Sequence, residues 1–335
     1  MKRAEQPRIA QLLADVPAGS VALTQHPAAG PDHMLLTEQF SAQTDGRGRV
    51  ASYAVFPGAN VSYTVFSAQE VRFHHAAEPA ILELFHCRSG RVGWNMQGGT
   101  AIYLGAGDLT AHSAACCADS AMMFPLGYAA GISISVDLPR LAANCPAALQ
   151  QAGFDAQAMQ AALCAGSPAA VPASPALEHI FAPLYAAPDN RRQAYLMLKV
   201  QELLLYLMDF QPGAQALTQY HAEQTELIKQ IHRQLTENLS QRFTIEELSR
   251  QYLINTSTLK EVFKAVYGLP IATYMKQYRV QQAMQLLRET DLPVSEIARQ
   301  VGYGTQGKFS NAFRDVAHML PTAYRREHCG SAPMR

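Results

Sequence analysis

Two stretches in the last third of the chain repeat one pattern of apolar and polar positions, about fifty residues apart. The first, TIEELSRQYLINTSTLKEVFK, begins at Thr244, and the second, PVSEIARQVGYGTQGKFSNAFR, begins at Pro293. In each copy a short helical pattern ends at a turn, and a second segment follows with apolar residues at i and i+4. This is the pattern of a helix-turn-helix, whose second helix enters the major groove of DNA. The sequence therefore predicts two DNA-reading helices in one chain.

The starts of these helices follow from capping chemistry. Thr244 and Glu247 have the spacing of a capping box, and Asn255 and Thr305 are positioned to cap the two second helices. The side chains that then point outward suit DNA, because Gln, Asn and Arg read base edges while Lys, Ser and Thr hold phosphates. The predicted DNA-binding residues are Thr256, Ser257, Lys260, Glu261 and Lys264 in the first copy and Thr305, Gln306, Lys308, Ser310, Asn311 and Arg314 in the second.

A single amphipathic segment, residues 270–290, separates the two copies. We expect one helix with Pro270 in its first turn. About nineteen residues at about 1.5 Å each span roughly 28 Å, which is compatible with reading helices one DNA turn, about 34 Å, apart. Three ordinary packed helices would show a similar periodicity, but two copies with matched caps favour DNA reading.

These segments resemble the DNA-binding domain of the AraC/XylS family of bacterial transcription regulators. The resemblance covers about Glu223 to Arg326 and rests on FKAVYGLPIATYMKQYRVQQAMQLL, SEIARQVGYGTQGKFSNAFR and the closing PTAYRR. It implies an all-helical domain that binds double-stranded promoter DNA in successive major grooves, in a regulator that acts on RNA polymerase. The chain departs from the family pattern at His318 and Leu253, where glycine is usual, and at Gly307, near the start of the second reading helix.

The charge of the chain is divided unequally. The whole chain carries 27 Lys plus Arg and 27 Asp plus Glu, whereas residues 221–335 carry 15 basic and 11 acidic residues. The net of four positive charges therefore lies on the part with the reading helices. We expect no secretory signal, no membrane span and no regular framework among the six cysteines, so we expect a cytoplasmic protein.

Residues 35–138 have a different pattern, in which apolar and polar positions alternate between turn signals. The Gly98-Gly99 pair between two alternating runs predicts a β-hairpin, and LGAGDL at residues 104–109 resembles a turn of cupin-like sensor domains. We therefore predict an α+β chain whose N-terminal β-barrel is of cupin-like or jelly-roll type. The expected domains are a cupin-like effector-sensing domain at 1–138, a helical connector at 139–220, an AraC-type DNA-binding domain at 221–327 and a tail at 328–335.

A barrel of this kind can bind a small-molecule effector through inward-facing side chains. The predicted effector-binding residues are Phe85, Trp94, Met96 and Tyr103. The alternative is that these residues only fill the core. Arg88 and Arg91 flank a predicted turn, where they could bind an acidic group or remain solvated.

Several histidines and cysteines raise the alternative of a cupin-type metalloenzyme fused to a DNA-binding domain. His74 and His75 are adjacent and would point to opposite faces of a strand, and Glu83, His86 and His112 complete no metal-ligand spacing. Because no catalytic arrangement is visible either, we predict a regulator that is not an enzyme and needs no metal or other cofactor.

The helical connector contains a segment, residues 191–210, whose apolar residues cover more than one stripe. Such a helix is buried on several sides. Two partners remain open from the sequence: the barrel of the same chain, or the partner subunit of a homodimer.

Overall fold

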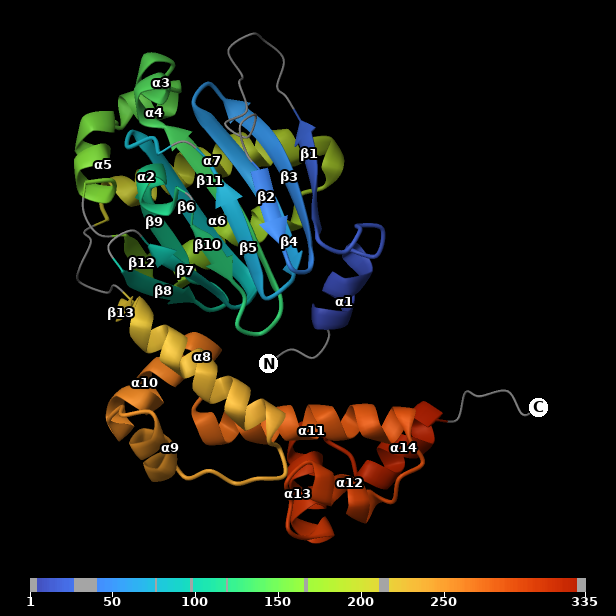
Figure 1. Cartoon of the computed structure of the whole chain (residues 1–335). Coiled ribbons are helices and arrows are strands. Elements are labelled where there is room, and N and C mark those ends of the chain that lie inside the picture. The colour runs from blue at the N-terminus through green and yellow to red at the C-terminus, as the bar shows by residue number, and fades with distance from the viewer. Residues whose placement is uncertain are drawn as a thin grey trace. The chain divides into compact units, whose positions relative to one another are not determined.

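The computed structural model describes residues 5–26, 41–75, 77–96, 99–118, 120–165, 168–210 and 217–329. The chain divides into two compact units, Met1–Ala222 and Glu223–Arg335 (Figure 1). In the described residues the strands all belong to the first unit, and the second unit is helical. The predicted α+β class, with a sheet-rich N-terminal part and a helical C-terminal part, is confirmed.

The strands of the first unit form two sheets. The larger, sheet A, has the order β1 (Ser20–His26), β3 (Arg47–Phe56), β4 (Ala59–Ser67), β11 (Ala129–Asp137), β6 (Ile81–Gly90), β9 (Leu109–Ser113) and β12 (Ala169–Val171). The smaller, sheet B, has the order β13 (Tyr220–His221), β8 (Thr100–Leu104), β7 (Val92–Met96), β10 (Ala121–Met123), β5 (Glu70–His74) and β2 (Ser41–Thr44). The expected barrel is thus two sheets, with no single closed ring among the described strands, because alternation fixes the faces of a strand but not whether a sheet closes.

Sheets A and B pack apolar faces against each other at one end. The shared core combines Trp94 and Met96 of β7 with Phe66 and Phe85 of sheet A. β7 and β8 pair antiparallel, which confirms the predicted hairpin. Gly99 in its turn has a φ of 77°, a conformation that glycine adopts without steric cost, whereas Gly98 lies outside the described residues.

Helices cover the other face of sheet A, so the first unit has three layers. Ile132, Ile134 and Val136 alternate along β11 and pack on these helices, as expected for a strand with period two. In Figure 1, α6 and α7 lie behind the sheet. The helices are α3 (Leu138–Ala143), α4 (Ala147–Gln151), α5 (Ala156–Leu163), α6 (Pro175–Ala186) and α7 (Arg192–Met208), while α1 (Glu5–Leu12) and α2 (Ala114–Cys117) lie elsewhere in the unit.

The apolar connector helix is α7, and one side of it belongs to the core of its own unit. Leu196, Val200 and Leu203 are fully buried in the layer between the helices and sheet A. On another side, Leu198 is 67% exposed and Met197 42% exposed. The homodimer contact therefore stays a prediction, now confined to this second side of α7.

The second unit consists of seven helices in its described residues. They are α8 (Ala222–Glu237), α9 (Ile245–Gln251), α10 (Thr256–Tyr267), α11 (Ile271–Glu289), α12 (Val294–Gln300), α13 (Gln306–Ala317) and α14 (Pro321–Cys329). In the part of the chain that the structure describes, no helix combines the length and apolar character that crossing a membrane requires.

Candidate nucleic-acid interface and effector site

The two helix-turn-helix pairs are α9 with α10 and α12 with α13, and their predicted caps are present. The Glu247 backbone N–H donates to Thr244 Oγ1 at 3.1 Å, and the Thr244 N–H donates to the Glu247 carboxylate at 2.8 Å. These hydrogen bonds hold the pKa of Glu247 below its usual range. The side chains of Asn255 and Thr305 each accept a backbone N–H three residues further on, at 2.8 and 3.3 Å. Both reading helices therefore begin where the capping residues predict.

The two turns share a geometry but differ in length. Leu253 and Gly302 are both left-handed, with φ of 52° and 83°. In each turn the next residue donates its N–H to a carbonyl five residues earlier, at 3.1 and 2.8 Å. The second turn then contains one more residue, Gly304, before its cap. A Cβ on Gly302 would lie 2.0 Å from the Leu239 carbonyl oxygen, so only glycine fits the second turn.

Apolar side chains fix which face of each reading helix points outward. Leu259 and Phe263 on α10 and Phe309 and Phe313 on α13 are all fully buried. Each pair is spaced at i and i+4, so it lies on one face of its helix. Consequently the polar residues between them lie on the face that the core does not use.

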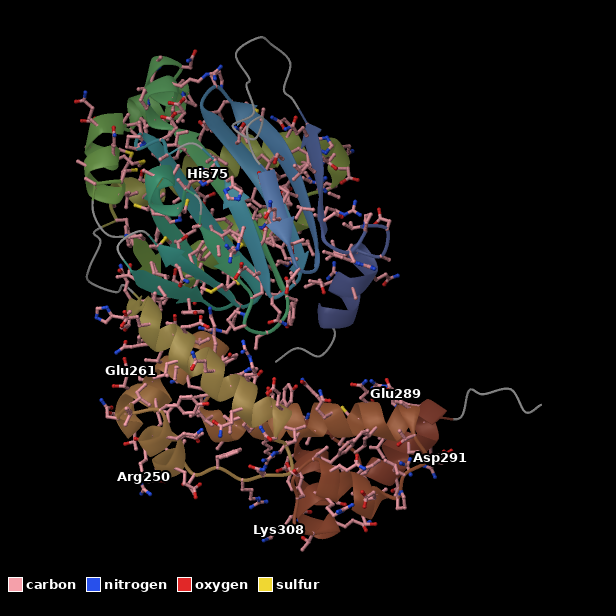
Figure 2. All side chains as sticks on the ribbon, in the orientation of Figure 1. His75, Arg250, Glu261, Glu289, Asp291 and Lys308 are labelled. Carbon is pink, nitrogen blue, oxygen red and sulfur yellow. The ribbon has the colours of Figure 1, made fainter. Side chains whose placement is uncertain are left out.

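The predicted DNA-binding side chains lie on this outer face. Figure 2 labels Glu261 on α10 and Lys308 on α13. Thr256 and Ser310 are partly buried. The exposed members are Ser257, Lys260, Glu261, Lys264, Thr305, Gln306, Lys308, Asn311 and Arg314.

Several members of this set already make hydrogen bonds within the protein, including Ser257, whose hydroxyl donates to Asn255 Oδ1 at 2.7 Å. Thr305 caps α13 through its side chain, and Arg314 Nη2 donates to Asn311 Oδ1 at 3.4 Å. Among the described residues, apart from its chain neighbours and the backbone of its own helix, Gly307 has no atom within 4 Å of the position that a Cβ would occupy. Packing within the protein therefore does not explain the glycine at that position.

An aromatic cluster that sequence reasoning missed joins α8 and α11 to the first helix-turn-helix. His232 Nε2 lies 2.8 Å from the Tyr274 hydroxyl, and the His232 ring stacks on Tyr267 with centroids 4.2 Å apart. Burial lowers the pKa of His232 to about 4. A neutral histidine on α8 therefore packs that helix against α10 and α11. Its only sequence signal is its place on the apolar face of α8.

The second half of α11 belongs to the other subdomain. Val280, Ala283 and Leu287 are fully buried with Ile297, Phe309 and Phe313. On the outside of the same helix, Lys276 Nζ lies 2.7 Å from Asp315 Oδ2 on α13. One continuous helix of 19 residues therefore carries part of the core of both helix-turn-helix units.

Comparison with known proteins agrees with this geometry. Residues 248–327 match a family described as a helix-turn-helix domain. The chain is 36% identical over 84 residues to a putative AraC-like transcription regulator of Streptomyces antibioticus, covering 25% of this chain and 28% of that protein. It is 33% identical over 91 residues to the HTH-type transcriptional activator RhaR of Mannheimia succiniciproducens, covering 27% of this chain and 33% of that protein. Residues 248–327 form an AraC-type helix-turn-helix domain.

One solved structure matches most of the length of this chain. The structure of unsaturated fatty acid bound wild-type ToxT from Vibrio cholerae matches 82% of this chain and 98% of ToxT, at 10% identity and a TM-score of 0.32. The two regulators named above match this chain over a third of their length or less.

In the first unit, three of the predicted effector-binding residues, Phe85, Trp94 and Met96, lie in the core between the sheets. The fourth, Tyr103, pairs with Gly93 and therefore lies on the opposite face of sheet B, because successive residues of a strand alternate between its faces. Phe85, Trp94, Met96 and Tyr103 are each 4% exposed. Phe85 and Trp94 meet edge to face with ring centroids 5.1 Å apart. Phe85, Trp94 and Met96 form the apolar end of the inter-sheet space, and their contact with an effector stays a prediction.

The other end of the inter-sheet face of sheet A is polar. Strand pairing places Glu83 of β6 beside His112 of β9 on one side and Ser135 of β11 on the other. Ser52 and Ser62 lie on the same face, with their hydroxyls 2.8 Å apart. The inner face of a sandwich is normally apolar, so this group, the inter-sheet polar cluster, is unusual.

Burial sets the protonation of the inter-sheet polar cluster. It raises the pKa of Glu83 to about 7, although a hydrogen bond from Ser135 acts in the opposite direction. Burial lowers the pKa of His112 to about 4. Near neutral pH the cluster therefore holds a neutral imidazole next to a carboxyl group that can gain or lose a proton.

The candidate metal ligands do not assemble as one set. Glu83 and His112 are neighbours, and His75 Nε2 lies 3.6 Å from Cys117 Sγ. His86 instead faces the helices, where it stacks on Phe181 with ring centroids 4.0 Å apart. Among the described residues, no three His, Cys, Asp or Glu side chains form a group that could hold a metal ion.

Proposed function

We propose that this protein is a transcription regulator whose promoter binding is controlled by a small molecule held between sheets A and B. The AraC-type domain, with two capped reading helices and polar outer faces, supports the first part. Its relatives named above are transcription regulators, which also supports a protein that is not an enzyme. The proposal implies a protein of the bacterial cytoplasm, with double-stranded promoter DNA and RNA polymerase as its partners.

The observation that carries effector control is the inter-sheet polar cluster. Polar groups are uncommon on the inner face of a two-sheet fold, so Glu83, His112 and Ser135 there favour a polar ligand. Part of their hydrogen-bonding capacity is used within the protein, since Ser135 hydrogen-bonds Glu83 and His112 Nδ1 lies 3.1 Å from the Ser113 carbonyl oxygen. Phe85 and Trp94 supply an adjacent apolar surface. Sites for small molecules commonly combine such a surface with a few directed polar groups.

DNA selection with the full chain tests the regulator, followed by footprinting on the selected site. We expect two protected segments about 10 bp apart on one face of the DNA. One protected segment per chain would contradict the two-reader arrangement.

Effector control is tested separately with Glu83→Gln. This substitution keeps the size of the side chain and removes its charge. We expect it to weaken the change in promoter affinity that cell metabolite extracts cause while DNA binding without extract stays the same. If the extracts changed the promoter affinity of Glu83→Gln as much as that of wild type, the effector would not bind at the inter-sheet polar cluster.

A further inference from the structure

A cavity of the first unit lies on the helix-covered side of sheet A. It has a volume of about 760 Å³ and is formed where the end of β6, the turn before β11 and the start of α6 meet. Its polar lining consists of His86, Arg88, Ser89, Glu178 and Tyr185. His86 points toward the helices and Glu83 toward the other sheet, because the two side chains lie on opposite faces of β6. The cavity is therefore distinct from the inter-sheet space.

A β-bulge directs Arg88 into this cavity. On β11, consecutive residues Ala130 and Gly131 pair with Ser89 and Cys87 of β6, so Arg88 is the extra residue in the ladder. Bulges re-aim side chains and occur often beside functional sites. The Arg88 guanidinium lies 4.4 Å from the centre of the Tyr185 ring, and no described carboxylate forms an ion pair with it.

Two buried polar atoms in the lining have no partner among the described residues. They are His86 Nε2 and Ser89 Oγ, in side chains that are 3% and 7% exposed. Such atoms are rare in folded proteins because each loses its bonds to water. Both residues line the cavity, so a molecule bound there could supply the missing hydrogen bonds.

The hydrogen bonds of Tyr185 indicate which role His86 Nε2 has. The Tyr185 hydroxyl donates to the His86 carbonyl oxygen at 3.3 Å and lies 2.9 Å from His86 Nδ1. Since a hydroxyl carries one proton, Nδ1–H donates to the Tyr185 oxygen and Nε2 is left as an acceptor. Burial, assisted by the charge of Arg88, lowers the pKa of His86 to about 4, so the ring stays neutral at pH 7.

We propose that this cavity is a second ligand site, for a small carboxylate that also carries hydrogen-bond donors. Arg88 binds the carboxylate, as guanidinium groups do. His86 Nε2 and the Glu178 carboxylate accept hydrogen bonds from hydroxyl or amino groups of the same molecule. Ser89 Oγ can donate a hydrogen bond to the carboxylate or accept one from a hydroxyl or amino group of the ligand. A ligand with only one of these two features leaves half of the lining without a partner.

Calorimetry on the full chain with four six-carbon probes tests the proposal. Gluconate carries a carboxylate and hydroxyls, 6-aminohexanoate a carboxylate and an amine, hexanoate only the carboxylate and sorbitol only hydroxyls. We expect gluconate or 6-aminohexanoate to bind at least about tenfold more tightly than hexanoate and sorbitol, which corresponds to about one lost charge-assisted hydrogen bond. The better of the two identifies the donor group.

Arg88→Gln should weaken the better probe at least about tenfold, whereas Arg72→Gln, an exposed arginine on β5, should leave its affinity unchanged. Arg88 is itself exposed, so its substitution should not unfold the unit, which circular dichroism checks. Equal binding to wild type and Arg88→Gln, equal binding of hexanoate, or no binding of gluconate and 6-aminohexanoate would each overturn the proposal. A negative result here would not contradict the proposed regulator function, because the calorimetry contains no DNA and Arg88→Gln does not alter the inter-sheet polar cluster.

Discussion

Gly268 and His318 end the two reading helices in the same way. Each is left-handed, with φ of 81° and 59°, and each donates its backbone N–H to the carbonyl four residues earlier, that of Lys264 or Arg314, at 2.8 Å. Glycine adopts this conformation without steric cost, whereas a residue with a Cβ does not. The same C-cap is therefore relaxed in the first helix-turn-helix and strained in the second.

His318→Gly should stabilise the second unit by about 1 kcal/mol, because it relieves the left-handed strain at the C-cap of α13. His318 is exposed, so little packing is lost. Chemical denaturation followed by circular dichroism measures the gain. The reciprocal change, Gly268→Ala, should destabilise by about the same amount, and a stabilising Gly268→Ala would show that the C-caps are not equivalent.

Leu253→Gly should also stabilise, again by about 1 kcal/mol. Its side chain is 94% exposed, so removing it opens no cavity, and its φ of 52° suits glycine. A loss of DNA binding in the more stable variant would instead assign Leu253 a contact outside the chain. Leu320→Ala is the matched control, since Leu320 is 48% exposed and not left-handed.

Asn311→Ala or Gln306→Ala should relax base preference at one or two positions of the selected DNA site. The expected cost is about 1 to 3 kcal/mol, the value of a bidentate base contact. Lys264→Ala should instead weaken all sequences alike and flatten the dependence of binding on salt. Binding curves on variant sites at several salt concentrations separate the two effects. A uniform loss in all three variants would refute the division into base and phosphate contacts.

The second unit should lose stability as pH falls from about 6.5 to about 4. His232 has a folded pKa of about 4, below the value of about 6.5 in an unfolded chain. The unfolded state therefore binds the proton first, and the stability present above pH 6.5 declines by up to roughly 3 kcal/mol. Unfolding of wild type and His232→Phe at pH 7.5 and 5 measures this. The same pH dependence in His232→Phe would place the titrating group elsewhere.

The single tryptophan should report which of the two ligand sites is occupied. Trp94 lies in the core between the sheets, so an inter-sheet effector should change its emission in a saturable way. A ligand in the Arg88 cavity, on the other side of sheet A, should leave the emission nearly unchanged. Trp94→Phe, which keeps an aromatic ring in the core, should fold and still bind ligands of the Arg88 cavity.

Local chemistry explains why the AraC-type domain could be predicted in detail. Its caps at Thr244 and Asn255, and its buried pairs such as Phe309 with Phe313, depend on residues within a few positions of each other. The first unit depends on strand pairing over long distances. Alternation predicted the hairpin of β7 and β8, but it could not bring Glu83 beside Ser135 or choose between a closed barrel and two sheets.

The same limit applies to the two sites of the first unit. Arg88 was recognised as a candidate for an acidic group, but its bulge exists only in the register between β6 and β11. The sequence offers His86 as a candidate metal ligand together with Glu83 and His112. His86 lies apart from them because it is three positions from Glu83 on β6, and residues an odd number of positions apart on a strand point to opposite faces.

The two turns of the AraC-type domain differ by one residue, Gly304, and its two reading faces carry different side chains. Because α11 joins these two different helix-turn-helix units in a fixed order, a single chain bound to DNA has a defined direction along it. A site read in this way has an upstream and a downstream end. Inverting it within a promoter would turn the whole protein around relative to the start of transcription, even though every base contact were kept.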